Sequence, residues 1–236
     1  MKVEEVIGVR LTSRDVEWLA WMSRWRAVTA YQVVAWFDPD SATLVKQVER
    51  SCRRFRELGL VESAKLLGDR PMTHSVTREG LRVVEIEHAG RRPVVGTLHH
   101  DLAVVDCATW LHHRRSIGSF MTEVEIRAID PPRAEFPEFA LRAAPGAGRA
   151  ILYPDLVTVH EQGLLAHEVE LARKDRTRAV ALMETYALSS RYLRVAYYGA
   201  PGVRKGLEEA AEKANKVVAG SGPKVFVRGW EWEERP

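Results

Sequence analysis

Carboxylates and a lysine stand close together in the second half of the chain, where their types suit the binding of a divalent metal. Asp155 follows Tyr153-Pro154, and Glu168, Glu170 and Lys174 come shortly after it. The apolar residues around these acids predict a β-hairpin, with one strand from Ile151 through Val159 and the next from Leu164 through Leu171. A carboxylate inside such a strand is costly unless it is paired, and a divalent cation is a common partner.

The relative register of the two strands decides whether these carboxylates can act together. Gly163 lies in the expected turn of a β-hairpin. If His160 faces Leu164 across it, Asp155 lies opposite Val169 and the carboxylates point apart. If the loop is one residue shorter or longer, Asp155 faces one of the two glutamates and all three acids share a face. A metal site requires that second register or a bulge; the alternative is an edge strand with a solvated acidic face.

Residues 1–85 predict three helices followed by a two-stranded wing. Thr12, Thr29 and Ser41 are suited to start the helices, and Gly59 to end the third. Two short strands joined by a turn follow, and Thr77 then caps a further helix. This order is typical of a winged helix-turn-helix. The tryptophans of the first helix have the spacing of a buried stripe, which favours core or dimer packing over base stacking.

The third helix is expected to contact DNA, because its apolar and basic residues lie on opposite sides. The apolar side carries Leu44, Val48, Cys52 and Phe55. The residues expected to bind DNA are Lys46, Arg50, Arg53 and Arg54, with Arg70 in the turn of the wing. The alternatives are a solvated basic face without a ligand, and a winged helix used for protein contacts.

Residues 86–96 are expected to form a linker, and residues 97–236 a second domain. The second domain is expected to contain a helix, a strand over 120–126 that includes Glu123 and Glu125, an irregular segment over 130–149 and the acidic hairpin. A helix, a strand, a helix and a last strand follow. Such an order predicts a mixed sheet flanked by helices.

Taken together, the motifs resemble the replication-relaxation family of plasmid and phage proteins. They are the winged helix, the linker, a helix opening with His100-x-Leu102, then Pro154-Asp155 and Glu168-Val169-Glu170-Leu171-x-x-Lys174. The resemblance covers most of residues 11–200. It implies an α+β and α/β protein of two domains, a winged helix-turn-helix followed by a PD-(D/E)xK nuclease-like domain.

The resemblance also implies a mechanism. Asp155 and Glu168 would hold Mg²⁺ or Mn²⁺ with the backbone carbonyl of Val169, and an upstream acid, Glu123 or Glu125, would complete the shell. The metal would polarise the scissile phosphate and activate water. The family pattern places a lysine two residues after the second acid. Glu170 occupies that position here, so Lys174 is expected to reach in from the following turn.

Composition limits the function only loosely. The chain has 236 residues, of which 46% are hydrophobic and 28% charged, and a formal net charge of +3. No apolar run approaches the roughly 20 residues that span a bilayer, and residues 1–5 contain no signal-peptide core. Cys52 and Cys107 are expected to be core thiols in a reducing compartment. We therefore expect a cytoplasmic protein that does not bind membranes.

Two functions remain open at this stage. The first is a mobile-element protein that binds double-stranded DNA in replication or its control, with Mg²⁺-dependent phosphodiester cleavage. The second is a non-enzymatic regulator, whose degenerate nuclease-like domain mediates dimerisation or partner binding. Asp155 and Glu168 favour the enzyme, and Glu170 in the lysine position favours the regulator.

Overall fold

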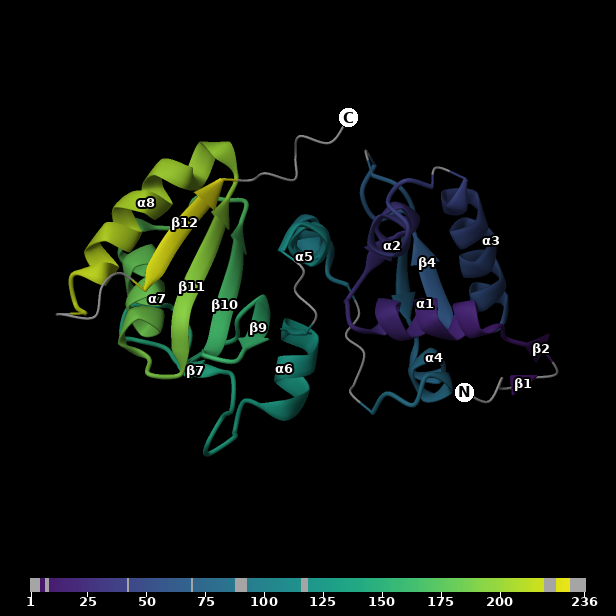
Figure 1. The fold of residues 1–236 in the computed structure, drawn as a ribbon, viewed down its shortest axis with the longest axis horizontal. Helices are drawn as coiled ribbons and strands as arrows, with labels where there is room; N and C mark the ends of the chain where they lie inside the picture. Colours follow the sequence, from purple (N-terminus) through teal and green to yellow (C-terminus); the bar gives the residue numbers. More distant parts are fainter. Residues whose placement is uncertain are drawn as a thin grey trace. The chain divides into compact units, whose positions relative to one another are not determined.

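The computed structural model is a mixed α and β protein that divides into two compact units, residues 1–116 and 117–236 (Figure 1). Each unit has its own helices and strands, and each is described by itself below. The structure describes residues 5–6, 9–41, 43–68, 70–87, 93–115, 119–218 and 224–229.

The first unit combines helices with a small antiparallel sheet. Its elements are β1 (Glu5–Val6), β2 (Val9–Arg10), α1 (Ser13–Ser23), β3 (Val28–Thr29), α2 (Ala30–Phe37), α3 (Leu44–Glu57), β4 (Val61–Ala64), β5 (Thr73–Val76), α4 (Arg78–Val83), the 3-10 helix η1 (Val95–Thr97) and α5 (Leu98–Arg115). The strand order β3-β5-β4 places the strand between α1 and α2 beside the hairpin that follows α3, and both pairings are antiparallel.

Local capping explains where several of these helices begin and end. Thr12 caps α1 through a reciprocal pair of hydrogen bonds with Asp15, and Thr29 caps α2 in the same way with Gln32. Gly59 follows α3 with a φ of +72°, a backbone conformation that glycine adopts without strain. The expected buried tryptophan stripe of α1 is present, because Trp18, Trp21 and Trp25 are all buried.

Helix α5 packs on α2, which differs from the expected division of the chain at residues 86–96. The Gln32 side-chain amide donates to the carbonyl of Leu102 at 2.8 Å and to the carboxylate of Asp106 at 2.9 Å. The rings of Trp36 and His112 stack with centroids 4.1 Å apart. These contacts keep α5 in the first unit, and the boundary falls after residue 116. Residues 88–92 of the expected linker lie outside the described part, as does the C-terminal tail.

The second unit is built around a mixed five-stranded sheet. Its elements are β6 (Phe120–Thr122), α6 (Glu123–Ile129), β7 (Leu141–Arg142), β8 (Ile151–Leu152), β9 (Leu156–His160), β10 (Gly163–Glu170), α7 (Arg176–Leu188), β11 (Tyr192–Gly199), α8 (Pro201–Asn215) and β12 (Val225–Gly229). The order is β12-β11-β10-β9-β6, in which β10, β11 and β12 are parallel, while β9 runs antiparallel to β10 and β6 antiparallel to β9.

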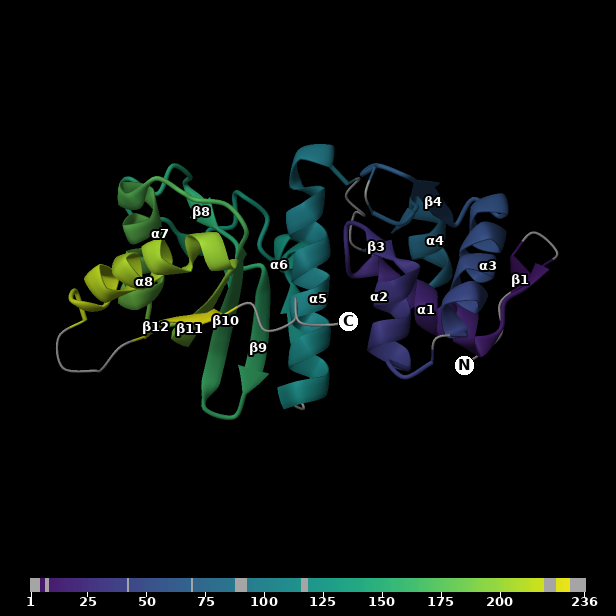
Figure 2. The ribbon, with the colours of Figure 1, turned by 90° about the horizontal axis from the view of Figure 1, so that it is seen from above.

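Helices α7 and α8 cover one face of this sheet (Figure 1 and Figure 2). The core between them is made of side chains that alternate along the strands, including Ala166 of β10 and Val195 and Tyr197 of β11. Met183 of α7 and Leu207 of α8 pack against them. The expected mixed sheet with flanking helices is therefore present.

Two expected strands are shorter in the structure. The strand predicted over 120–126 ends at Thr122, whose side chain caps α6 together with Glu125, so both upstream glutamates lie on a helix. The strand predicted from Ile151 through Val159 breaks after Leu152, and β8 pairs with β7 instead of continuing into β9. Pro154 lies at the break, where a residue without an N–H cannot donate to a strand ladder.

The segment between α6 and β8 is irregular, as expected, but it is held in place by buried polar contacts. The Asp130 carboxylate accepts hydrogen bonds from the backbone N–H groups of Glu138, Phe139 and Ala140, each at 2.6 Å. The backbone N–H of Ala144 donates to the hydroxyl of Thr185 on α7 at 2.9 Å. This segment is therefore tied to α7 before the chain enters the acidic hairpin.

Within the described ranges, no helix combines the length and the apolar character needed to cross a membrane.

Candidate metal centre and nucleic-acid interface

The hairpin of β9 and β10 has the register that a shared carboxylate site requires. Gly163 pairs with His160, and His167 pairs with Leu156. The pairing ends there, and Asp155 directly precedes β9; continuing the register by one residue would place Asp155 opposite Glu168. Residues directly opposite each other in an antiparallel pair project from the same face, so these two acids share a face with Glu170. That is the face covered by α7 and α8.

Backbone contacts fix the position of Asp155 between the strands. Its carboxylate accepts a hydrogen bond from the backbone N–H of Val169 at 2.8 Å, and its carbonyl accepts one from the N–H of Glu123 at 3.0 Å. The residue is buried. Asp155 therefore stands beside β10 and the start of α6, with its side chain held next to Glu168.

Glu168 is partly buried and is oriented by a tyrosine from α7. The hydroxyl of Tyr186, itself buried, donates a hydrogen bond to the Glu168 carboxylate. Burial and the nearby negative charge of Asp155 raise the pKa of Glu168 to about 8, although Tyr186, Lys174 and Arg149 oppose the shift. A cation between the two carboxylates would relieve their repulsion.

Lys174 reaches the same cluster from the loop after β10. Its ammonium forms an ion pair with Glu170, a buried carboxylate. Burial lowers the pKa of Lys174, while the charges of Glu168 and Asp155 oppose that shift. Lys174 therefore points into the acidic cluster, as the family resemblance suggested, and Glu170 is its direct partner.

Both upstream glutamates have partners on α6 or at its cap. The Glu125 carboxylate accepts from the N–H of Thr122 at 2.7 Å as part of the α6 cap, and Glu123 pairs with Arg127 at 2.6 Å. Among the residues that the structure describes, no group of three or more His, Cys, Asp or Glu side chains could hold a metal ion. The expected third metal-binding carboxylate is therefore not found among these residues. Glu123 and Glu125 lie on helix α6, which begins directly after Thr122, and not on a strand of the sheet.

Asp155 and Glu168 are still suited to a small hard cation. Mg²⁺ keeps several of its waters and is commonly bound by one or two carboxylates together with substrate phosphates. Both residues offer oxygen ligands, and a bound cation would stabilise their charged forms against burial and mutual repulsion. The two residues that could hold Mg²⁺ or Mn²⁺ are therefore Asp155 and Glu168.

The basic side of α3 is largely accessible. Lys46, Arg50 and Arg53 are exposed, and the Arg50 guanidinium donates to the carbonyl of Lys46 at 3.2 Å. Arg70 is exposed between β4 and β5. Arg56, which the sequence analysis did not select, is also exposed on this helix.

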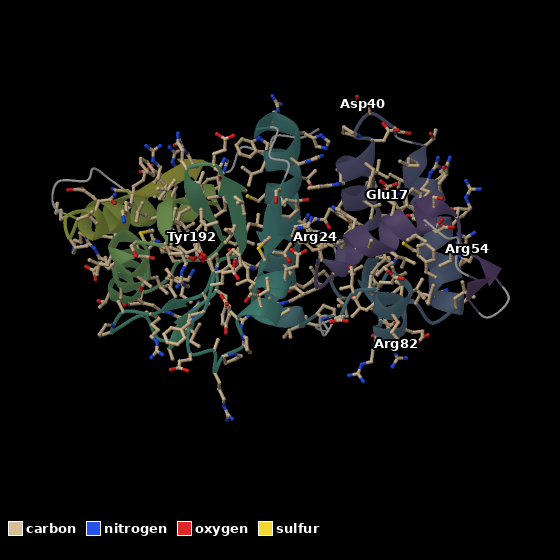
Figure 3. All side chains as sticks on the ribbon, turned by 60° about the horizontal axis from the view of Figure 1, so that its bottom comes forward. Glu17, Arg24, Asp40, Arg54, Arg82 and Tyr192 are labelled. Atoms are coloured by element: carbon tan, nitrogen blue, oxygen red, sulfur yellow. The ribbon has the colours of Figure 1, made fainter. Side chains whose placement is uncertain are left out.

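Arg54 has a different environment from the other basic residues of α3. Arg54 is labelled in Figure 3. Its guanidinium forms an ion pair with the buried carboxylate of Asp15 at the start of α1. The hydroxyl of Ser51 donates to the same carboxylate at 3.4 Å. Arg54 therefore ties α3 to α1, and phosphate contacts are better assigned to its exposed neighbours.

Sequence reasoning also missed Tyr186 and Arg149, which act on Glu168 from other elements. Nothing in their local sequence marks them, because their proximity depends on how α7 and the irregular segment fold over the sheet.

Comparisons of the chain with family models, with curated proteins and with solved structures gave no match.

Proposed function

We propose that this protein binds double-stranded DNA through its first unit and cleaves phosphodiester bonds in its second unit, in the replication of a mobile element or its control. The observation that carries the proposal is the placement of Asp155 and Glu168 on one face of a β-hairpin, with the Lys174 side chain among them. Two acids and a lysine in this arrangement resemble a PD-(D/E)xK centre.

The first unit supports DNA binding through its order of elements. Helices α1, α2 and α3 precede a hairpin, and the hairpin is extended by β3. We interpret this as a winged helix-turn-helix in which α3 is the recognition helix and the β4–β5 turn is the wing. Lys46, Arg50 and Arg53 are the side chains available to phosphates or base edges.

The residues of the second unit have separable roles in this proposal. Asp155 and Glu168 hold the divalent cation, which supplies Lewis-acid activation of the phosphate and of water. The Tyr186 hydroxyl and the Val169 N–H orient the two carboxylates. Lys174 supplies a positive charge for the phosphate, and Glu170 holds that lysine in place.

One observation favours the non-enzymatic regulator as a second candidate. Glu170 occupies the position of the family's lysine and neutralises the lysine that replaces it. Cleavage therefore requires the substrate phosphate to compete with Glu170 for Lys174. A protein in which that competition fails would bind DNA, and would bind the metal, without cutting.

A plasmid-cleavage assay distinguishes the two functions. Supercoiled DNA is incubated with the wild type in Mn²⁺, in Mg²⁺ and in EDTA, beside Glu168→Gln and Lys174→Ala. The proposal expects nicked or linear DNA only with wild type and metal. A wild type that binds the plasmid but leaves it supercoiled in both metals supports the regulator.

A further inference from the structure

A cavity of about 360 Å³ adjoins the acidic cluster, and Lys174 belongs to both. Its wall is formed by the loop after β10 and by the facing sides of α7 and α8. The volume is at the lower end of the roughly 300–1,000 Å³ that small-molecule sites occupy, which suits a ligand of mononucleotide size.

The cavity joins an apolar floor to a cationic rim. Ala179 of α7 and Val203 and Leu207 of α8 are buried side chains that line it. The rim carries the positive groups Arg173, Lys174, Arg176 and Lys205. An apolar surface below several cations suits a ligand with a flat apolar part and an anionic part, as a nucleotide has.

The rim of the cavity also carries one negative group, the carboxylate of Glu209. Glu209 of α8 pairs with Arg176 of α7 at 3.3 Å, and both side chains are largely exposed. The ion pair spans the two helices beside the cavity. A phosphate entering the rim would compete with Glu209 for Arg176, so Glu209 is expected to weaken anion binding there.

We propose that this cavity binds one nucleotide of a DNA strand. Its base would pack on Val203 and Leu207, and its phosphate would contact the cations of the rim. This nucleotide would lie next to the phosphodiester bond that is cleaved at Asp155 and Glu168. The inference rests on the proposed function, because the occupant is taken to be part of the cleaved DNA. It adds a substrate subsite whose residues are distinct from the two acids. Only Lys174 is shared.

The probe for this subsite is thymidine 3′,5′-bisphosphate, added to the full chain in EDTA so that no metal-dependent step contributes. Binding is measured by calorimetry and by chemical-shift changes of the Val203 and Leu207 methyl groups. We expect saturable binding that perturbs these methyls. Lys205→Ala and Arg173→Ala should each weaken it about tenfold, because a lost charge-assisted hydrogen bond costs roughly that factor.

Two further variants provide a control and a test in the opposite direction. Lys216→Ala is the matched control, because Lys216 is an exposed lysine just beyond the other end of α8, paired with Glu212. It should bind the probe as the wild type does. Glu209→Gln should bind more tightly by a few-fold, since it removes the competing carboxylate. An increase in affinity cannot arise from misfolding.

The possible results separate this inference from the proposed function. Absence of binding, binding that leaves the two methyls unchanged, or equal affinity in all variants overturns the subsite. If the wild type binds the bisphosphate at these methyls but never cleaves DNA, the subsite stands and the cleavage proposal fails. If the wild type cleaves DNA but binds no bisphosphate, only the subsite fails.

Discussion

The backbone N–H of Val169 on β10 donates a hydrogen bond to the carboxylate of Asp155 at 2.8 Å. Asp155 directly precedes β9, and Val169 directly follows Glu168, so this contact holds the Asp155 side chain against β10 next to Glu168. The negative charge of Asp155 contributes to the raised pKa of Glu168, which is consistent with two neighbouring acids.

The acidic pair should make the metal-free protein less stable at higher pH. The pKa of Glu168 is raised in the folded state, to about 8 from an ordinary 4.5, so folding favours its protonated form. Stability from this group is fully present below pH 4.5 and is lost as the pH rises toward 8. At about 1.4 kcal/mol for each unit of the shift, the loss should be at most about 5 kcal/mol. Denaturation in EDTA at several pH values measures it.

Glu168→Gln is the control for that experiment, because a neutral amide cannot lose a proton. The difference in unfolding free energy between wild type and variant should fall with pH, and Mn²⁺ should restore the wild type alone. A difference that stays constant between pH 5 and 8 would show that the pKa of Glu168 is not raised in the folded protein.

The Tyr186 hydroxyl should act as a positioning group for Glu168. Tyr186→Phe removes the hydrogen bond that its hydroxyl donates to the Glu168 carboxyl group, which should destabilise the protein by about 1–2 kcal/mol. The pKa of Glu168 should rise further, so Mn²⁺ binding should shift to higher pH. Titration of Mn²⁺ by electron paramagnetic resonance at several pH values measures that shift. A purely structural tyrosine would change stability and leave the pH profile where it is.

The exposed basic residues of α3 should determine the salt dependence of DNA binding. Arg50→Ala with Arg53→Ala should reduce the slope of log affinity against log salt by about two, roughly one for each lost phosphate contact. Arg82→Ala is a charge-matched control, because Arg82 is exposed on α4 and pairs with Glu79 (Figure 3). Equal slopes for the double variant and the control would remove α3 from the interface.

Arg54→Ala should behave differently from those variants. It leaves the buried carboxylate of Asp15 without its ionic partner, so it should lower stability by about 2 kcal/mol or more. The salt slope at a temperature where it remains folded should match the wild type. Thermal melting and salt titrations of the same sample test both statements.

Much of this arrangement was predictable because it depends on local patterns. The capping threonines, the apolar runs and turn residues of the acidic hairpin, and the glycine after α3 each specify a nearby feature. The turn around Gly163 left the register open between alternatives, and the structure adopts the shorter loop. The strand predicted over Glu123 and Glu125 was wrong because the capping box of Thr122 with Glu125 favours a helix.

Contacts between residues far apart in the chain could not be predicted from local sequence patterns. The contact of Tyr186 with Glu168 requires the path of α7 across the sheet. The attachment of α5 to the first unit depends on Gln32, whose amide reaches a helix far along the chain. Neither contact leaves a periodic signal.

The packing of α5 on α2 should stabilise the first unit. A fragment of residues 1–116 should be more stable than one of residues 1–86, because the shorter fragment loses the partners of Gln32 and Trp36. The difference should be several kcal/mol, since buried polar groups and an apolar surface become exposed. Thermal melts of the two fragments compare them. Equal melting temperatures would place the boundary at residues 86–96 after all.

Asp155 and Glu168 are expected to share one divalent cation. Crystals of the full chain soaked in Mn²⁺ and measured at the manganese absorption edge give the answer. We expect an anomalous peak about 2.1 Å from a carboxylate oxygen of each residue, beside Lys174, and no such peak in Asp155→Asn crystals. The absence of a peak in the wild type, or a peak that persists unchanged in the variant, would contradict it.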